Sequence, residues 1–118
     1  MKRILFFSVP LLVAFNLFAK EVYIDPGPNA QERLQEALIL IEEGDTLIIK
    51  SGYYKFEDGL SLDVDNVTVK GEGIDSTILD FKNQQSGAQG LLVTSDKVTL
   101  SDFSILDAKG DALKVIGA

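Results

Sequence analysis

Short blocks of similar sequence recur in the second half of the chain, and the spacing between copies shrinks toward the C-terminus. GLSL at 59–62 returns as GLLV at 90–93, and DNVTV at 65–69 returns at the same spacing as DKVTL at 96–100. ILDFK at 78–82 returns after a shorter interval as ILDAK at 105–109, and GLLV returns after a shorter one still as ALKV at 112–115. Strand-like blocks that persist while their connections shorten indicate stacked structural repeats.

Two connections account for the change in spacing. The segments 70–77 and 83–90 are each replaced by a shorter segment in the next copy. Removing both differences leaves a repeat of roughly 22 residues, a length typical of solenoid repeats. Three short strands with tight bends fit this length at about 3.3 Å per residue, and no connection has helical periodicity.

The first copy of the repeat is placed by a further match. DTLI at 45–48 aligns with STIL at 76–79, at the same spacing that separates GLSL from GLLV. We therefore predict an all-β solenoid over residues 45–118, truncated after about two and a half coils.

Apolar residues alternate along the repeated blocks, as expected for strands with one buried face. Stacked copies would place like residues together, with Leu60 on Leu91, Val67 on Val98 and Val69 on Leu100. The predicted core comprises Leu47, Ile49, Leu60, Leu62, Val64, Val67, Val69, Ile78, Leu91, Val93, Val98, Leu100, Ile105, Leu113 and Val115.

The N-terminal segment has the features of a secretory signal peptide. Lys2 and Arg3 precede an apolar run over residues 4–19 that ends on the small residue Ala19. A membrane anchor is the alternative, but the run is shorter than the roughly 20 residues that a spanning helix needs, and Pro10 interrupts it. We expect residues 1–19 to be removed and the protein to be periplasmic or secreted, with no stable membrane anchor afterwards.

Residues 20–44 predict a short strand followed by a capping helix. The strand spans 20–25 and ends at the Pro-Gly-Pro break of 26–28. Asn29 is placed as the N-cap, with Glu32 as its capping-box partner, and Gly44 as the C-terminal stop. Apolar residues at 34, 37, 38 and 41 form one face of a helix of about 14 residues. We expect this helix to cover the end of the repeat; a partner-binding helix is the alternative.

Acidic residues dominate the charge of the chain. Without Lys2 and Arg3, nine basic residues remain against 18 acidic ones, which argues against nucleic acid or an anionic membrane as a partner. The chain has no Cys and no His, so it lacks disulfides, the usual zinc and copper ligands, and any Ser-His-Asp or Cys-His catalytic set. We expect no cofactor, with calcium as the one exception considered below.

Three stretches resemble the first coils of right-handed parallel β-helix proteins of the pectin-lyase-like superfamily: GDTLIIKSGYY at 44–54, VTVKGEG at 67–73 and STILD at 76–80. Within that group the chain is most similar to exported bacterial parallel β-helix repeat proteins. The resemblance covers residues 22–118 and implies a right-handed parallel β-helix. It also implies polysaccharide as the ligand class, and a lyase, hydrolase or epimerase if the full protein is an enzyme. Many activities share these opening coils, so the resemblance specifies the fold more than the function.

The carboxylates offer two candidate sites. Asp80 and Asp107 occupy equivalent positions of ILDFK and ILDAK, and stacking about 4.8 Å apart would bring them near the separation that glycoside hydrolysis requires. The alternative is a surface ladder of turn aspartates balanced by Lys82 and Lys109. Asp111 is a third, weaker catalytic candidate.

Calcium is the other use of carboxylates that the sequence allows. Asp102, Asp107 and Asp111 are near one another in sequence, and carboxylate oxygens are the ligands that calcium prefers. No Asp-x-Asp-x-Asp-Gly loop is present, so the sequence does not favour a metal site. Tyr53 and Tyr54 are the remaining candidates, since an exposed tyrosine ring can stack on a sugar; adjacent aromatics in a strand usually divide into one packed and one exposed ring.

The sequence therefore favours the N-terminal part of an exported protein that binds or processes polysaccharide, with any active residues outside this chain. A non-enzymatic periplasmic scaffold or envelope-associated binding module is the alternative. At the C-terminal edge of the repeat, we expect either further coils or self-association to cover the strand edges.

Overall fold

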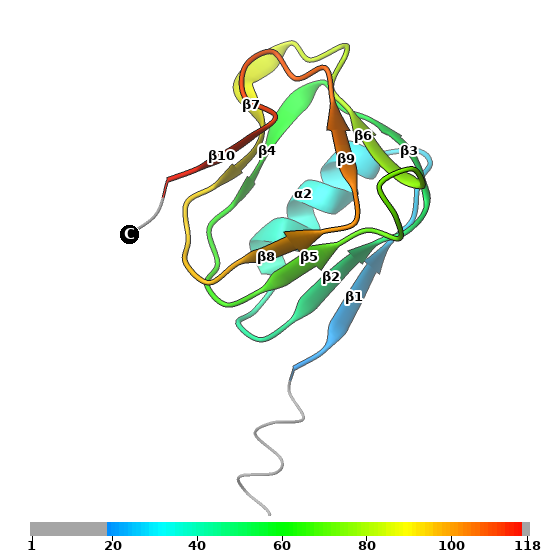
Figure 1. Ribbon diagram of the computed structural model, residues 1–118. Coiled ribbons are helices and arrows are strands. Elements are labelled where there is room, and N and C mark those ends of the chain that lie inside the picture. Colours follow the sequence, from blue (N-terminus) through cyan, green and yellow to red (C-terminus); the bar gives the residue numbers. More distant parts are fainter. Residues whose placement is uncertain (1–18, 117–118) are drawn as a thin grey trace, which may run out of the picture.

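The computed structural model describes residues 19–116 (Figure 1). The predicted signal segment lies outside the described residues except for Ala19, as do residues 117 and 118. The described elements are β1 (Glu21–Ile24), α2 (Ala30–Leu40), β2 (Thr46–Ile49), β3 (Gly52–Lys55), β4 (Asp58–Leu62), β5 (Thr68–Lys70), β6 (Thr77–Asp80), β7 (Ser86–Val93), β8 (Thr99–Ser101), β9 (Ser104–Leu106) and β10 (Leu113–Val115).

The strands form three parallel sheets around one apolar core. Their orders are β1-β2-β5-β8, β3-β6-β9 and β4-β7-β10. From β2 onward, consecutive strands belong to different sheets, so the chain changes sheet at each connection. Buried side chains from all three sheets and from α2 belong to the same hydrophobic cluster, as Leu34, Leu47, Leu62 and Leu79 illustrate.

This arrangement corrects the predicted fold class. The sequence predicted an all-β solenoid, a right-handed parallel β-helix with an N-terminal amphipathic capping helix, truncated after about two and a half coils. The described residues instead form three separate short parallel sheets of three or four strands, together with one α-helix. The helix was expected as a cover over the end of the repeat, and it is also part of the core, because Leu34 and Leu38 on it are as buried as the strand residues.

The strand register confirms most of the repeat pairs. Leu60 lies opposite Leu91, which in turn lies opposite Leu113, as the repeated blocks predicted. Val69 lies opposite Leu100, also as predicted. Like residues stack because a parallel register brings the same face of each strand to the core.

The placement of the first copy is wrong. DTLI at 45–48 was aligned with STIL at 76–79, but Thr46 pairs with Thr68, whereas Thr77 pairs with Gly52 in another sheet. The two blocks have similar sequences because each contains the start of a parallel strand. They are not stacked on one another.

The core list needs two corrections. Ile78 is only half-buried, and its neighbour Leu79 is the buried apolar residue of β6, since successive residues of a strand face opposite sides. Leu113 and Val115 are exposed. An aromatic column that the repeat pattern did not include, Tyr54, Phe56 and Phe81, fills the core; the ring centroids of Phe56 and Phe81 lie 5.0 Å apart.

The predicted helix is present but shorter, with 11 residues. Its predicted apolar face is confirmed, because Leu34, Leu38 and Ile41 are buried. Asn29 precedes the helix with a left-handed φ of 61°, and its side chain makes no capping hydrogen bond. Gly44 has the expected positive φ of 93° but lies in the turn beyond the helix, which ends at Leu40.

Helix α2 packs against β1, β3 and β4, which are the first strands of the three sheet orders. In Figure 1 the helix lies behind the sheets, at the end of the molecule opposite β8, β9 and β10. Two glutamines on α2 complete the hydrogen bonding of the β4 edge. Gln35 accepts from the Ser61 N–H at 2.9 Å and donates to the Ser61 carbonyl at 3.1 Å, while Gln31 bonds in the same way to Glu57 and Asp58. The side-chain amides thus take the place of a neighbouring strand.

Candidate functional site: a cleft between helix α2 and strand β3

A cleft of about 460 Å³ lies between the N-terminal turn of α2 and the segment that joins β3 to β4. Its walls combine one exposed tyrosine, one lysine, side-chain amides and carboxylates. The exposed polar and aromatic residues that line it are Asn29, Glu32, Tyr53, Lys55, Glu57, Asp58 and Asn83. The cleft is mostly polar, and its one exposed aromatic ring lies beside groups that can donate and accept hydrogen bonds.

Strand alternation positions the tyrosine. Tyr54 is 1% exposed and points into the core, where its hydroxyl donates to the carbonyls of Ile24 and Lys50. Tyr53, one residue earlier, is 51% exposed and lines the cleft. The expected division into one packed and one exposed ring is therefore confirmed. Burial raises the pKa of Tyr54 to about 12.

Asp80 holds Tyr53 in place. The Tyr53 hydroxyl donates to Asp80 Oδ2, and the Lys82 backbone N–H donates to Asp80 Oδ1 at 2.8 Å. The hydrogen bond from Tyr53 lowers the pKa of Asp80, and the same bond raises the pKa of Tyr53. Asp80 is only 6% exposed, so its carboxylate is occupied by these partners and orients the tyrosine ring.

The predicted pairing of Asp80 with Asp107 is wrong by one residue. In the β6–β9 register Asp80 lies opposite Leu106, and not opposite Asp107 as the match between ILDFK and ILDAK predicted. Asp107 follows the strand, in the left-handed region with φ 56°, and is exposed. The two carboxylates are therefore not equivalent positions of neighbouring strands.

The other candidate aspartates lie on the surface. Asp102 and Asp111 are exposed, and Asp102 lies in a turn with φ 65°. Within residues 19–116, no three Asp or Glu side chains gather in an arrangement that would hold a metal ion. The set Asp102, Asp107 and Asp111, which the sequence allowed for calcium, does not converge.

Sequence reasoning missed Gln31, Lys55 and Asn83 as residues of the cleft. Gln31 lies within the predicted helix but outside its apolar face, yet its side chain accepts a hydrogen bond from the backbone N–H of Glu57, 26 residues away. No local pattern reveals such a contact, because the contact depends on how α2 packs on β4. The polar residues that follow the Pro-Gly-Pro break were the only sequence signal at this position.

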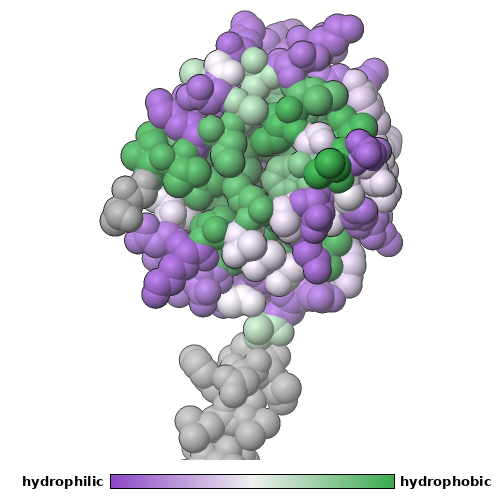
Figure 2. Space-filling view, in the orientation of Figure 1, coloured by the Kyte–Doolittle hydropathy of each residue, from purple (hydrophilic) through white to green (hydrophobic). Residues whose placement is uncertain are grey.

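A second feature is an apolar end face. Figure 2 shows apolar side chains gathered over β8, β9 and β10, the end of the molecule that α2 does not cover. Leu113 is 42% exposed and Val115 is 60% exposed. A hollow of about 290 Å³ on this face is lined by Leu100, Ser101, Phe103, Ile105, Ala112 and Leu113. Large exposed apolar patches of this kind mark interaction surfaces.

No family model, no curated protein and no solved structure matches the chain. The site is therefore interpreted from its own residues. Across residues 19–116, no helix has the length and apolar character needed to cross a membrane.

Proposed function

We propose that this chain is a non-catalytic polysaccharide-binding module of an exported protein, and that the cleft beside α2 holds the sugar. The observation that carries the proposal is the placement of Tyr53. Its ring is half exposed at the cleft while its hydroxyl is tethered to Asp80, so the ring is held in position before any ligand arrives. A fixed aromatic face loses little conformational entropy when it packs on the C–H face of a sugar ring.

The polar residues of the cleft supply the hydrogen bonds that a sugar needs. Asn83 offers an amide donor and acceptor, and Lys55 and Glu57 offer a charged donor and acceptor. The acidic residues Glu32, Glu57 and Asp58 outnumber the single lysine of the lining, and the whole chain carries a formal charge of −7. This balance favours neutral polysaccharides over polyuronates, which the surrounding charge would repel.

Catalysis is assigned elsewhere because Asp80 is not free to act as one member of a carboxylate pair. A glycoside hydrolase needs one carboxyl group free to transfer a proton and a second at a defined distance. The Asp80 carboxylate is buried and accepts hydrogen bonds from the Tyr53 hydroxyl and the Lys82 N–H. Asp107 does not lie opposite Asp80 in the β6–β9 register.

Isothermal titration calorimetry with a neutral oligosaccharide and a matched oligouronate tests this function. Tyr53→Ala should abolish binding of the neutral ligand, and Tyr53→Phe should bind it more weakly than wild type, because the ring provides the contact and the hydroxyl provides only the tether to Asp80. Tyr23→Ala is the matched control, since Tyr23 is 53% exposed but lies outside the cleft lining. Equal binding by wild type and Tyr53→Ala, or tighter binding of the uronate, would contradict the proposal.

A second candidate function, self-association, is favoured by the apolar end face. We propose that a second copy of the chain covers it. The strands β8, β9 and β10 are each at the end of their sheet order, so among the described residues each has one edge without a strand neighbour. Residues 96–116 carry four acidic and three basic residues, a near-neutral balance within a strongly acidic protein. Two such faces therefore meet without the repulsion expected elsewhere on the surface.

Helix α2 occupies the other end, so head-to-tail stacking is blocked and a two-fold pair of like faces is the expected form. Light scattering after size exclusion should show a dimer, and the double variant Leu113→Asp, Val115→Asp should be a monomer. Ile39→Asp is the control, since Ile39 is 64% exposed on α2. A monomeric wild type at all concentrations tested would refute this second function.

A further inference from the structure

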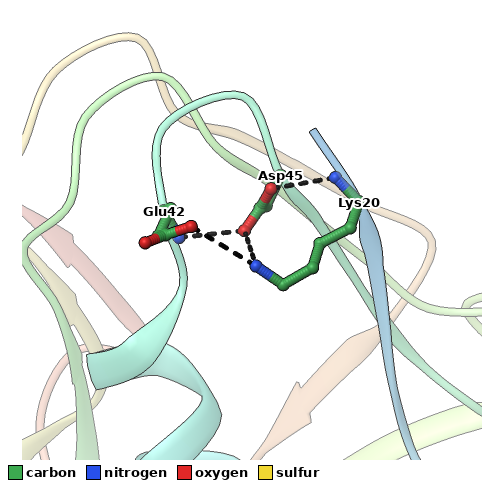
Figure 3. Close-up of polar contacts among 3 residues, drawn as sticks. All are labelled: Lys20, Glu42 and Asp45. Atoms are coloured by element: carbon green, nitrogen blue, oxygen red, sulfur yellow. Dashed lines mark hydrogen bonds and ion pairs between the residues drawn. The ribbon is translucent and has the colours of Figure 1, made fainter. Parts of the chain in front are cut away.

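Asp45 is a buried carboxylate in the turn that leads from α2 to β2. It is 1% exposed, yet it is fully hydrogen-bonded. Its Oδ1 accepts from the backbone N of Lys20 at 3.0 Å, and its Oδ2 accepts from Lys20 Nζ at 3.2 Å and from the Glu42 N–H at 3.0 Å (Figure 3). Both nitrogen atoms of one lysine therefore converge on one buried carboxyl group.

Burying a carboxylate costs free energy unless charged or hydrogen-bonded partners compensate for the lost water. Burial alone raises the pKa of Asp45, but the hydrogen bonds from the backbone of Lys20 and Glu42, together with the Lys20 ammonium, bring it below its ordinary value. The hydrogen bond to Asp45 in turn raises the pKa of the Lys20 side chain. The ionised Asp45 carboxylate therefore favours a positively charged group beside it.

Lys20 is also the residue at which strand pairing begins within residues 19–116. The Thr46 N–H donates to the Lys20 carbonyl at 3.0 Å, and Glu21 lies opposite Thr46 in the β1–β2 register. The preceding residue, Ala19, is exposed and is the small residue that ends the apolar segment of residues 4–19. A signal peptidase cuts after a small residue of this kind, and Leu17, two residues earlier, departs from the small-x-small pattern of such sites.

We propose that the mature protein begins at Lys20 and that Asp45 is the binding site for its new α-ammonium group. Hydrolysis by a signal peptidase breaks the Ala19–Lys20 peptide bond with one water molecule. The released segment keeps the new carboxylate on Ala19, and the Lys20 nitrogen takes up protons to become an ammonium group. The nitrogen then keeps the position 3.0 Å from Asp45 Oδ1 that the amide occupies.

The exchange strengthens the contact. A neutral N–H donor becomes a charged one, and charge-assisted hydrogen bonds are roughly twice as strong as neutral ones. Asp45 then faces two cationic groups from the same residue. Cleavage at this bond therefore strengthens the attachment of the start of β1 to the turn after α2. Removal of residues 1–19 thus stabilises the fold of the remaining chain.

The first test is N-terminal sequencing and intact mass of the protein exported from cells that express the full chain. A mature N-terminus at Lys20 is expected. Cleavage at any other bond, or an intact leader, would overturn the proposal.

The second test measures the α-amine itself. A carboxylate partner raises the pKa of an ammonium group, so at neutral pH the Lys20 α-amine should acetylate roughly tenfold more slowly in the folded protein than in urea, as a shift of about one pKa unit implies. Mass spectrometry of the N-terminal peptide gives the rate. Asp45→Asn should remove the protection, and Glu42→Gln should keep it, because the Glu42 carboxylate contacts only Nζ.

If Asp45→Asn does not fold, the comparison between folded and urea-unfolded wild type still decides the question. Equal rates in the two states would show that Asp45 does not hold the α-ammonium group.

Discussion

Gln84 is the most informative single position for testing how this fold completes its hydrogen bonding. It is 4% exposed in the segment that leads from β6 into β7. Its Nε2 donates to the carbonyls of Ser86 at 3.0 Å, Gly87 at 3.3 Å and Gln89 at 2.9 Å, and its Oε1 accepts from the Lys109 N–H at 3.0 Å. One amide therefore organises its own loop and joins it to the following copy.

Gln84→Leu keeps a similar size and removes every one of these bonds. The unsatisfied groups left in the interior cost about 1–3 kcal/mol each, and exposed Ser86 and Gly87 recover part of that cost from water. Lys109 is exposed as well, so the carbonyl of half-buried Gln89 is the principal loss, and we expect the free energy of unfolding to fall by about 2 kcal/mol.

Gln84→Glu adds a pH signature. The new carboxylate retains the acceptor toward Lys109 but turns an acceptor oxygen toward three carbonyls. Only the protonated acid restores a donor, so the folded-state pKa of the introduced group should lie above its unfolded value of about 4.3. The favourable protonated contact is then present below the unfolded pKa and is lost as pH rises through the folded pKa.

Urea titrations of wild type, Gln84→Leu and Gln84→Glu at neutral and mildly acidic pH measure both effects, with the midpoint and slope fitted together. Gln85→Leu and Gln85→Glu are the controls, because Gln85 is the exposed neighbour. Gln84→Glu should gain stability on acidification relative to Gln85→Glu. If both Gln84 variants match their Gln85 controls, this account of the loop is wrong.

Three further changes test the core. Phe81→Ala should lower the free energy of unfolding by about 3–5 kcal/mol in urea titration, because Phe81 is fully buried against Phe56; a loss below about 1 kcal/mol would refute its core position. Gly71→Ala should lower the free energy of unfolding by about 1–3 kcal/mol, since a Cβ there would overlap the Asp102 carbonyl oxygen; an unchanged melting temperature would contradict this close contact between Gly71 and Asp102. Leu91→Asp should prevent folding, as a charge would enter the core; cooperative melting by circular dichroism would show otherwise.

The sequence predicted the strand pairs that stack apolar residues. Leu60 and Leu91 were paired correctly because both strands bury the same face, and a parallel register preserves that face from one strand to the next. The apolar period also predicted α2, since Leu34 and Leu38 face the core regardless of where the helix ends. Features that repeat with a local period are therefore visible in one sequence.

The same reasoning failed where two similar sequences do not occupy equivalent positions in the sheet. ILDFK and ILDAK look alike, yet the register places Asp80 opposite Leu106, one residue away from the match by sequence. A slip of one residue reverses which side of a strand each residue faces, so the catalytic pairing depended on a detail that similarity alone does not determine.

The cleft and the buried polar contacts could not be predicted because their partners are distant in sequence. Gln35 bonds to Ser61, and Asp45 bonds to Lys20 across 25 residues. Glutamine and aspartate at these positions look like ordinary surface residues until the helix packs on the sheet edges.

The most direct test of the central claim, that the cleft beside α2 binds a neutral polysaccharide, is a two-dimensional NMR titration of the isotopically labelled protein with a neutral oligosaccharide. We predict saturable shift changes confined to the cleft, at Gln31, Tyr53, Lys55 and Asn83, with none on β8, β9 and β10. Changes confined to the apolar end face, or no changes up to millimolar ligand, would contradict the account.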